Sequence, residues 1–271
     1  MNILSLVYLG NVRWFSKVCF GESVIDLHEH YVKQSYRNRC EIFGAGGRMA
    51  LSVNVAKNRG AMRDVRIDYS KRWQHQHRQA LVSAYAGAPY FDHYWPELES
   101  LYSRRFEFLA DLNVVAAEIL LRLLGSDARL RFSESYIEPA GVIADGFADR
   151  LTNKFTAGFA NRFTNEITDR FANEFTDEFA DGIAGRSIDK FTDLRDAISP
   201  KPRLARPDPQ FRPVPYWQVF GNGVFEPDLS VVDLLFCEGP RALGVIRDSV
   251  IDNGQLTITT GENSLSQGGA A

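Results

Sequence analysis

Short apolar runs alternate with polar stretches between residues 2 and 69. In order, the runs are NILSLVYL, SVIDL, RCEIF, RMALSVNV and DVRIDY, all of strand-like length. The stretches FGAGGR and KNRGA supply turns between them, because glycine accepts backbone angles that other residues avoid. After the first run, NVRWFSKV fits a helix capped by Asn11. The pattern therefore predicts several short strands and one early helix.

The spacing of apolar positions changes to that of a helix from Ser70 onward. Trp73, His77, Leu81 and Tyr85 recur at four-residue intervals, which places them on one face of a helix. Serine is a residue type that caps helices, so the sequence predicts Ser70 as the cap of this helix.

More helices and two more strands are expected downstream. The segments APYFDHYWPELESLYSRR and EFLADLNVVAAEILLRLLG fit helices, and Gly125 ends the second. RLRFSESY and YWQVF have strand-like patterns, whereas LSVVDLLFCEGPRAL fits a helix that stops near Gly239 and Pro240. Strands followed by helices predict an α/β or α+β fold in one layered domain.

An apolar residue, mostly phenylalanine, occupies every fourth position from Ile143 to Ile183. On a helix this stripe drifts about 40° per repeat, so no single flat face could bury it. We expect a long helix or a partly disordered insertion. Two interpretations stay open: an expanded repeat tolerated on the surface, or a phenylalanine rod that binds a partner or mediates self-association.

The tetrad repeat divides the chain into three parts. Residues 1–140 and 191–250 form the expected core domain, residues 141–190 the insertion, and residues 251–271 a polar, flexible tail. With 271 residues, of which 45% are hydrophobic, the chain is long enough to bury a substantial core.

The charge and the residue types argue against several classes of protein. A formal charge of -3 argues against a nucleic-acid-binding surface, since such surfaces need an excess of basic residues. No apolar run approaches the roughly 20 residues of a membrane span, and the opening residues lack the features of a secretory leader, so we expect a cytoplasmic protein. Cys19, Cys40 and Cys237 lack CxxC spacing, so the cysteines indicate neither a disulfide framework nor a zinc knuckle. We expect no cofactor and, on balance with the histidine pair described next, no metal.

The stretch HEHYVKQSYRNRC, residues 28–40, concentrates the candidate chemistry. His28 and His30 share one side if this stretch is a strand, with Glu29 on the other side. Three interpretations are open: surface histidines, a metal pair with a distant third ligand, and His28 as general acid or base. The metal interpretation is the weakest, because HxH lacks the spacing of HExxH-type zinc motifs.

Within it, YVKQSYRNRC, residues 31–40, forms a basic loop without balancing carboxylates. Its six polar residues are Lys33, Gln34, Ser35, Arg37, Asn38 and Arg39. Such a set can clamp a phosphate or a carboxylate, with arginine donating two parallel hydrogen bonds. The alternative is a structural arginine that pairs with core carbonyl groups or with Asp26 and Asp64. His77 also has two interpretations, a satisfied core histidine or, if its helix face borders the loop, a proton-transfer group.

Several of these stretches together resemble the WbqC-like protein family. In order, they are HEHYVKQSYRNRC, VRIDYSKRWQHQHRQALVSAYAGAPYFDHYWPELESLY, DLRDAISPK, YWQVF and FEPDLSVVDLLFCEGP. The resemblance implies a cytoplasmic protein of O-antigen or other surface-polysaccharide synthesis. It further implies a candidate transferase that moves glycyl or related acyl groups to a nucleotide-activated amino sugar.

The resemblance also carries over to single residues. The family's signatures fall on Arg37, Asn38 and Arg39, on Trp73 and His77, on Pro89, Tyr90 and Phe91, and on Asp233, Glu238, Gly239 and Pro240. Two residues depart from the family's pattern: Gly10 stands where a proline is expected, and Cys237 where asparagine is usual.

We expect the basic loop to bind the phosphate or carboxylate of a nucleotide sugar, with Glu238 in the substrate-binding set. Trp73 and Tyr90 would offer stacking surfaces, and His28 or His77 would transfer a proton. The reaction would proceed by positioning and general-base catalysis. The alternative function is a non-catalytic scaffold of glycan assembly, with the phenylalanine repeat as its docking rod.

Overall fold

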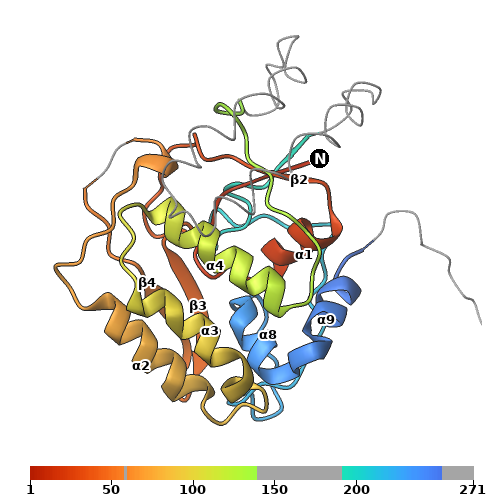
Figure 1. The fold of residues 1–271 in the computed structure, drawn as a ribbon. Coiled ribbons are helices and arrows are strands. Elements are labelled where there is room, and N and C mark those ends of the chain that lie inside the picture. The colour runs from red at the N-terminus through yellow and green to blue at the C-terminus, as the bar shows by residue number, and fades with distance from the viewer. Residues whose placement is uncertain (58–59, 139–190, 252–271) are drawn as a thin grey trace, which may run out of the picture.

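The computed structural model describes residues 1–57, 60–138 and 191–251 (Figure 1). The tetrad repeat and the polar tail lie outside these residues, so their expected conformations and roles stay predictions. The described chain is a mixed α/β fold with N-terminal strands followed by helices, as the sequence predicts. Within the described part, no helix is both long and apolar enough to span a membrane.

Three short parallel strands form the sheet near the N-terminus. They are β1 (Asn2–Leu4), β2 (Ser23–Ile25) and β5 (Thr192–Asp193). β1 lies in the middle, where Ile3 pairs with Val24 on one side and with Asp193 on the other. Parallel strands need a crossover connection, which helix α1 (Val12–Phe20) provides between β1 and β2.

Helix α1 begins where the sequence predicts. Asn11 caps it, since its Oδ1 accepts a hydrogen bond from the N–H of Trp14 at 2.9 Å. Gly10 lies so close to the core that a Cβ atom there would be 2.8 Å from Val7 Cγ2 and 3.1 Å from Trp14 Cε3. The position that departs from the family's pattern therefore requires the smallest residue.

A two-stranded antiparallel hairpin extends from the body of the molecule. Its strands are β3 (Arg39–Gly44) and β4 (Gly47–Ser52), joined by the predicted glycine turn, in which Gly47 has a φ of +97°. Alternate residues of β3, Cys40 and Ile42, face the core and are almost fully buried. The hairpin contacts helices on its inner face through β3.

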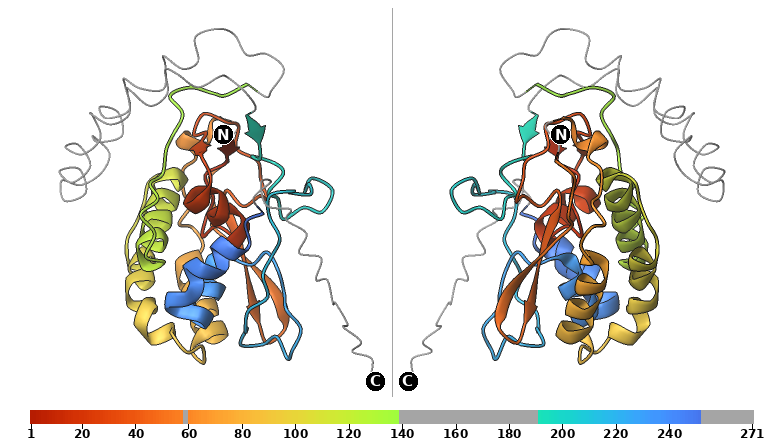
Figure 2. Two further views of the ribbon diagram at one scale, coloured as in Figure 1. Left: turned by 90° about the vertical axis from the view of Figure 1, so that its right-hand side faces the viewer. Right: turned by 90° about the vertical axis from the view of Figure 1, so that its left-hand side faces the viewer.

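Three helices stack along one side of the molecule (Figures 1 and 2). They are α2 (Trp73–Tyr85), α3 (Phe91–Ser103) and α4 (Leu109–Leu123), and a short 3-10 helix, η1 (Met62–Asp64), packs on α4. The predicted apolar face of α2 is confirmed: Trp73, His77, Leu81 and Tyr85 are buried. Gly125 follows the end of α4 with a φ of +71°, as a helix-ending glycine does.

The predicted start of α2 is wrong by two residues. Arg72, rather than Ser70, precedes the helix. Ser70 instead bonds to Asp68, to which it donates through its N–H at 2.8 Å and its hydroxyl at 2.9 Å. A serine engaged in this turn cannot cap a helix.

Helix α8 (Val231–Glu238) lies at the centre of the fold and contacts α1, α3, α4 and β3. The side chains from Val231 to Cys237 are all buried, and all of them except Asp233 are apolar, as in a helix that is surrounded by the core. Beyond it, the 3-10 helix η3 (Gly239–Arg241) and helix α9 (Ala242–Asp248) complete the described chain. The helix predicted for this segment is confirmed, including its stop near Gly239.

Three segments with strand-like patterns do not form the predicted strands. DVRIDY and RLRFSESY contribute isolated bridges, such as Val55 with Ile67 and Ile25 with Phe132. YWQVF has no strand partner. A strand needs a neighbouring strand to hydrogen-bond its backbone groups. The pattern of apolar and polar residues in one segment does not show whether such a neighbour exists.

Candidate functional site

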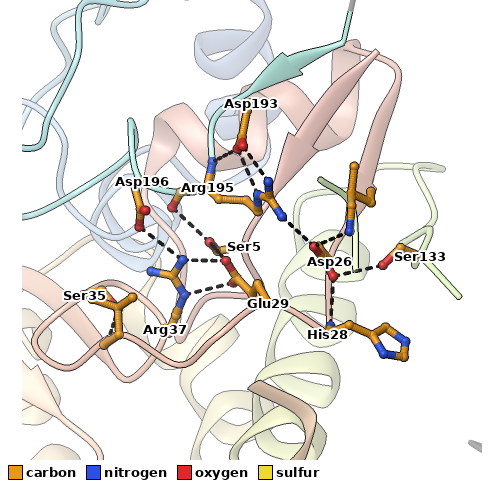
Figure 3. Close-up of polar contacts among 12 residues, drawn as sticks. Ser5, Asp26, His28, Glu29, Ser35, Arg37, Ser133, Asp193, Arg195 and Asp196 are labelled. Atoms are coloured by element: carbon orange, nitrogen blue, oxygen red, sulfur yellow. Dashed lines mark hydrogen bonds and ion pairs between the residues drawn. The ribbon is translucent and has the colours of Figure 1, made fainter. Parts of the chain in front are cut away.

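The carboxyl ends of the three parallel strands meet at one edge of the sheet, and polar residues follow each of them. Ser5 follows β1, Asp26 follows β2, and Arg195 and Asp196 come just after β5. Open parallel sheets form ligand sites outside this edge. Figure 3 shows that these residues and Glu29 form one network of hydrogen bonds and ion pairs.

Asp26 is the most deeply buried carboxylate of this network, with no exposed side-chain surface. Its two oxygens accept hydrogen bonds from Arg195 Nη1 at 2.6 Å, the Ser133 hydroxyl at 3.1 Å, His28 N at 2.9 Å and Ile137 N at 3.1 Å. Arg195 also donates to Asp193 in β5. Four donors on two oxygens leave Asp26 no lone pair for a ligand, so it holds the edge together.

The second half of the network is a buried ion pair between Glu29 and Arg37. Arg37 donates through Nε to Glu29 Oε1 at 2.9 Å and through Nη2 to Oε2 at 2.5 Å. The Ser5 hydroxyl is 3.1 Å from Glu29 Oε2 and 2.9 Å from the carbonyl oxygen of Arg195. Arg37 Nη2 also reaches Asp196 Oδ1 at 3.2 Å. Because the Asp196 side chain is 60% exposed, the network runs from the core to the solvent.

Glu29 is the group of this network that titrates near neutral pH. Burial raises the pKa of Glu29 to about 7, and Arg37 and the Ser5 hydroxyl oppose that rise only in part. Glu29 can therefore accept or release a proton under physiological conditions, as a general base or acid must.

Arg37 forms ion pairs with Glu29 and Asp196, not with the Asp26 and Asp64 of the structural interpretation, and its substrate-binding role stays a prediction. Its backbone carbonyl accepts a further bond from Asn113 Nδ2 at 2.7 Å. Among the described residues, its third nitrogen, Nη1, forms no hydrogen bond.

The loop that leads to Arg37 is open to solvent on its outer side. Lys33 and Gln34 are exposed, whereas Ser35 is buried and donates to the carbonyl oxygen of Val32 at 2.6 Å. Gln34 has a φ of +54°, an unfavourable backbone conformation for a residue with a side chain. Lys201 donates to the Lys33 carbonyl oxygen at 2.8 Å, which fixes the loop against the segment after β5.

Asn38 and Arg39 point away from this loop and fasten the start of β3. Asn38 Nδ2 donates to the carbonyl oxygen of Val53 at 3.0 Å, and Arg39 Nε to the Ser52 hydroxyl at 3.3 Å. The structure thus separates them from the Glu29–Arg37 pair, and their substrate-binding role stays a prediction.

His28 lies at the border of the network, and its ring points away from Glu29 and Arg37 (Figure 3). The pKa of His28 is lowered by burial and by Arg63, and Asp26 and Asp64 oppose this only in part. Residues 27–29 form a bend and His30 only an isolated bridge with Ala61, so the strand on which the histidine pair depends does not form. Within the described part of the chain, no group of His, Cys, Asp and Glu is placed to hold a metal ion.

His77 lies in the core, in a chain of hydrogen bonds. Its Nε2 is 3.2 Å from the Ser52 carbonyl oxygen, which can only accept, so Nε2 carries the proton. Nδ1 then accepts from the Tyr8 hydroxyl at 3.0 Å, which in turn accepts from Tyr102 at 2.9 Å. Burial lowers the pKa of His77 to about 4. These features describe a neutral core histidine. Trp73 packs edge-on against His77 and is only 1% exposed, so the faces of the Trp73 ring are covered.

Tyr90 and Glu238 lie together at the end of α8, on a third part of the molecule. The Tyr90 ring covers Gly239, where a Cβ atom would come within 2.5 Å of it. The N–H of Tyr90 donates to the carbonyl oxygen of Phe236 at 3.0 Å. Glu238 lines a hollow that also involves residues 214–225. The predicted site residues are therefore divided among the sheet edge, the core and this hollow.

The sequence reasoning missed Ser5, Glu29, Arg195 and Asp196. A polar residue directly after a short apolar strand is a signal that could have found Ser5. No local signal could have found Arg195 and Asp196, because they join the edge from a segment more than 150 residues further along the chain, as the separation of 159 between Arg37 and Asp196 illustrates.

Comparison with known proteins gives one finding. The profile of the WbqC-like protein family matches residues 15–167, a range that includes Asp26, Glu29, Arg37 and helices α2 to α4 and ends within the tetrad repeat. Neither the curated proteins nor the solved structures contain a match to this chain. Because the matched range spans more than half of its residues, the chain belongs to the WbqC-like protein family.

Proposed function

We propose that this protein is a cytoplasmic transferase of O-antigen or other surface-polysaccharide synthesis that acts on a nucleotide-activated amino sugar at the carboxyl edge of the sheet. The observation that carries the proposal is Glu29, a buried carboxyl group with a pKa of about 7 at the place where parallel sheets form their ligand sites. The polysaccharide context is what the resemblance to the WbqC-like family implies, and the chain belongs to that family.

Acyl transfer to an amino sugar needs a group that accepts a proton. The sugar amine attacks the acyl carbon, a bond from nitrogen to carbon forms, and the bond to the donor's leaving group breaks with its electron pair. The attacking amine loses a proton, and a carboxylate with a pKa near 7 suits this step. The proposal assigns it to Glu29 rather than to His28 or His77, whose rings face elsewhere.

Arg37 would bind an anionic group of the substrate. Asp196 holds Arg37 Nη2 from the solvent side with an exposed carboxylate, which occupies the place that a phosphate oxygen would take. A phosphate that displaces Asp196 would gain this contact and the unused Nη1, and Lys33 on the exposed loop would add a second cation. Ser5 and Arg37 would meanwhile keep the Glu29 carboxyl group oriented.

The test is thermal stabilisation of the full chain by a panel of nucleotides, nucleotide sugars and acyl donors. A ligand at 100 times its dissociation constant stabilises by about 2.7 kcal/mol. Lys33→Ala and Glu29→Gln are compared with Lys71→Ala, an exposed lysine outside the network. Arg37→Ala is not used, because it would leave a cavity and an unpaired Glu29 carboxylate, whereas Glu29→Gln keeps the size of the side chain and an amide oxygen that can accept from Arg37.

The proposal expects a nucleotide sugar to stabilise the native protein and Lys71→Ala alike, and Lys33→Ala much less. Glu29→Gln should keep binding and lose turnover of that ligand with an acyl donor. If no ligand of the panel stabilises the folded native protein, the transferase proposal fails and a binding or scaffold role takes its place.

A further inference from the structure

The hollow beside Glu238, of about 650 Å³, lies between residues 214–225 and the C-terminal helices. This volume is typical of small-molecule sites. Its helical wall consists of Glu238 at the end of α8, Arg241 in η3, and Val245 and Asp248, which are three residues apart on one face of α9. The hollow shares no residue with the network at the sheet edge.

The opposite wall is held rigidly from inside. Asp233, a buried residue of α8, accepts hydrogen bonds from the hydroxyl groups of Tyr216 at 2.7 Å and Tyr85 at 2.9 Å and from Gln218 Nε2 at 3.1 Å. Gln218 also exchanges two bonds with the backbone of Glu226, at 2.9 and 2.8 Å. The segment from 214 to 226 is therefore positioned by buried polar contacts although it forms no strand.

This anchoring presents one large aromatic ring to the solvent. Tyr216 and Gln218 point inward to Asp233, so Trp217 between them points outward and is 54% exposed. The other tryptophans, Trp14, Trp73 and Trp95, are at most 8% exposed. An exposed indole that lines a hollow, on a segment held by buried hydrogen bonds, is a binding surface for a flat apolar face.

The charges of the hollow favour hydroxyl groups over anions. Glu238 has only 12% of its side chain exposed and pairs with the 80% exposed side chain of Arg241 at 3.6 Å. Asp248 adds a second carboxylate at the lining. Asp248 pairs with the exposed Arg247 at 3.5 Å, as Glu238 does with Arg241, so the lining offers a phosphate no excess of positive charge. Carboxylate oxygens can still accept hydrogen bonds from neutral hydroxyl groups.

We propose that this hollow binds an uncharged saccharide ring. A pyranose has an apolar face of C–H groups, which would lie on Trp217, and hydroxyl groups at its edge, which would donate to Glu238 and Asp248. The proposal goes beyond the transferase proposal and does not depend on it, because the two sites have no residue in common.

The experiment uses galactose, N-acetylglucosamine and lactose as neutral probes and UDP as an anionic probe. Binding to the full chain is measured by ligand-observed NMR, and burial of Trp217 by protection of its fluorescence from acrylamide. The variants are Trp217→Ala, Trp217→Phe as the control that keeps an aromatic face, Glu238→Gln, and Lys33→Ala as the control at the sheet edge. Circular dichroism checks that each variant is folded.

The expected result is that at least one neutral saccharide binds and protects the fluorescence. Trp217→Ala should weaken that binding by roughly tenfold or more, Glu238→Gln by less, and Trp217→Phe only slightly. Lys33→Ala should leave it unchanged whether or not the transferase proposal holds. The proposal is overturned if no neutral saccharide binds, if UDP alone protects the fluorescence, or if folded Trp217→Ala binds as the native protein does.

Discussion

The buried pair of Glu29 and Arg37 predicts a destabilisation that depends on pH. Arg37→Met keeps much of the apolar stem and removes the guanidinium. Breaking a buried ion pair costs about 3–5 kcal/mol, because one charge is left without its partner. A charge pair about 4 Å apart at an effective dielectric constant of 20 gives a similar value, about 4 kcal/mol.

The destabilisation caused by Arg37→Met should grow with pH. At low pH Glu29 binds a proton, so no unpaired charge is left in the core. In the native protein the pKa of Glu29 is about 7, and without Arg37 it should rise further. Below pH 7 both folded proteins hold Glu29 protonated, so the loss is limited to hydrogen bonds, about 1–2 kcal/mol. Above that pH the variant's folded state keeps a proton that the native protein has released. The difference in free energy of unfolding between the native protein and Arg37→Met then increases by up to about 1.4 kcal/mol per pH unit.

The assay is urea unfolding followed by circular dichroism across pH 6 to 9, with urea chosen because it does not screen charges. Adding Glu29→Gln to Arg37→Met should recover about 2–3 kcal/mol at the alkaline end and remove the pH dependence. Arg78→Met, which breaks the exposed pair of Arg78 and Glu99, should cost less than about 1 kcal/mol at every pH. Additive effects of Arg37→Met and Glu29→Gln, or a flat pH profile for Arg37→Met, would refute this account of the network.

Three further predictions concern single residues, each checked by urea unfolding. Gly239→Ala should cost about 2–4 kcal/mol, because φ is +54° and the new Cβ would meet the Tyr90 ring; an unchanged midpoint would contradict this. Burial raises the pKa of Glu118 from 4.5 to about 7, so stability falls as pH rises through that window, and Glu118→Gln should gain about 2 kcal/mol above it and little below it. Tyr8→Phe should cost about 1–3 kcal/mol by leaving His77 Nδ1 without a donor, and a neutral effect would argue against this hydrogen bond.

The sequence alone determined the elements whose signals are local. The cap at Asn11, the four-residue spacing from Trp73 to Tyr85, the glycine turn at Gly47 and the apolar segment of α8 each occupy one short stretch of chain. Their hydrogen bonds close within a few residues, so residue types and spacing suffice to predict them. Family membership was likewise visible in the order of several stretches.

Only the tertiary structure decided which polar groups meet. Arg37 pairs with Glu29 and Asp196, and Asp26 with Arg195, 169 residues away, because the parallel strands β2, β1 and β5 end at one edge. Strands of two or three residues are too short to show an alternation of apolar and polar positions. Which side chains pair across such long sequence separations depends on the order and register of the strands in the sheet. For the same reason, His77 falls in the core instead of beside the basic loop, and its ring is neutral where a sequence reading leaves its role open.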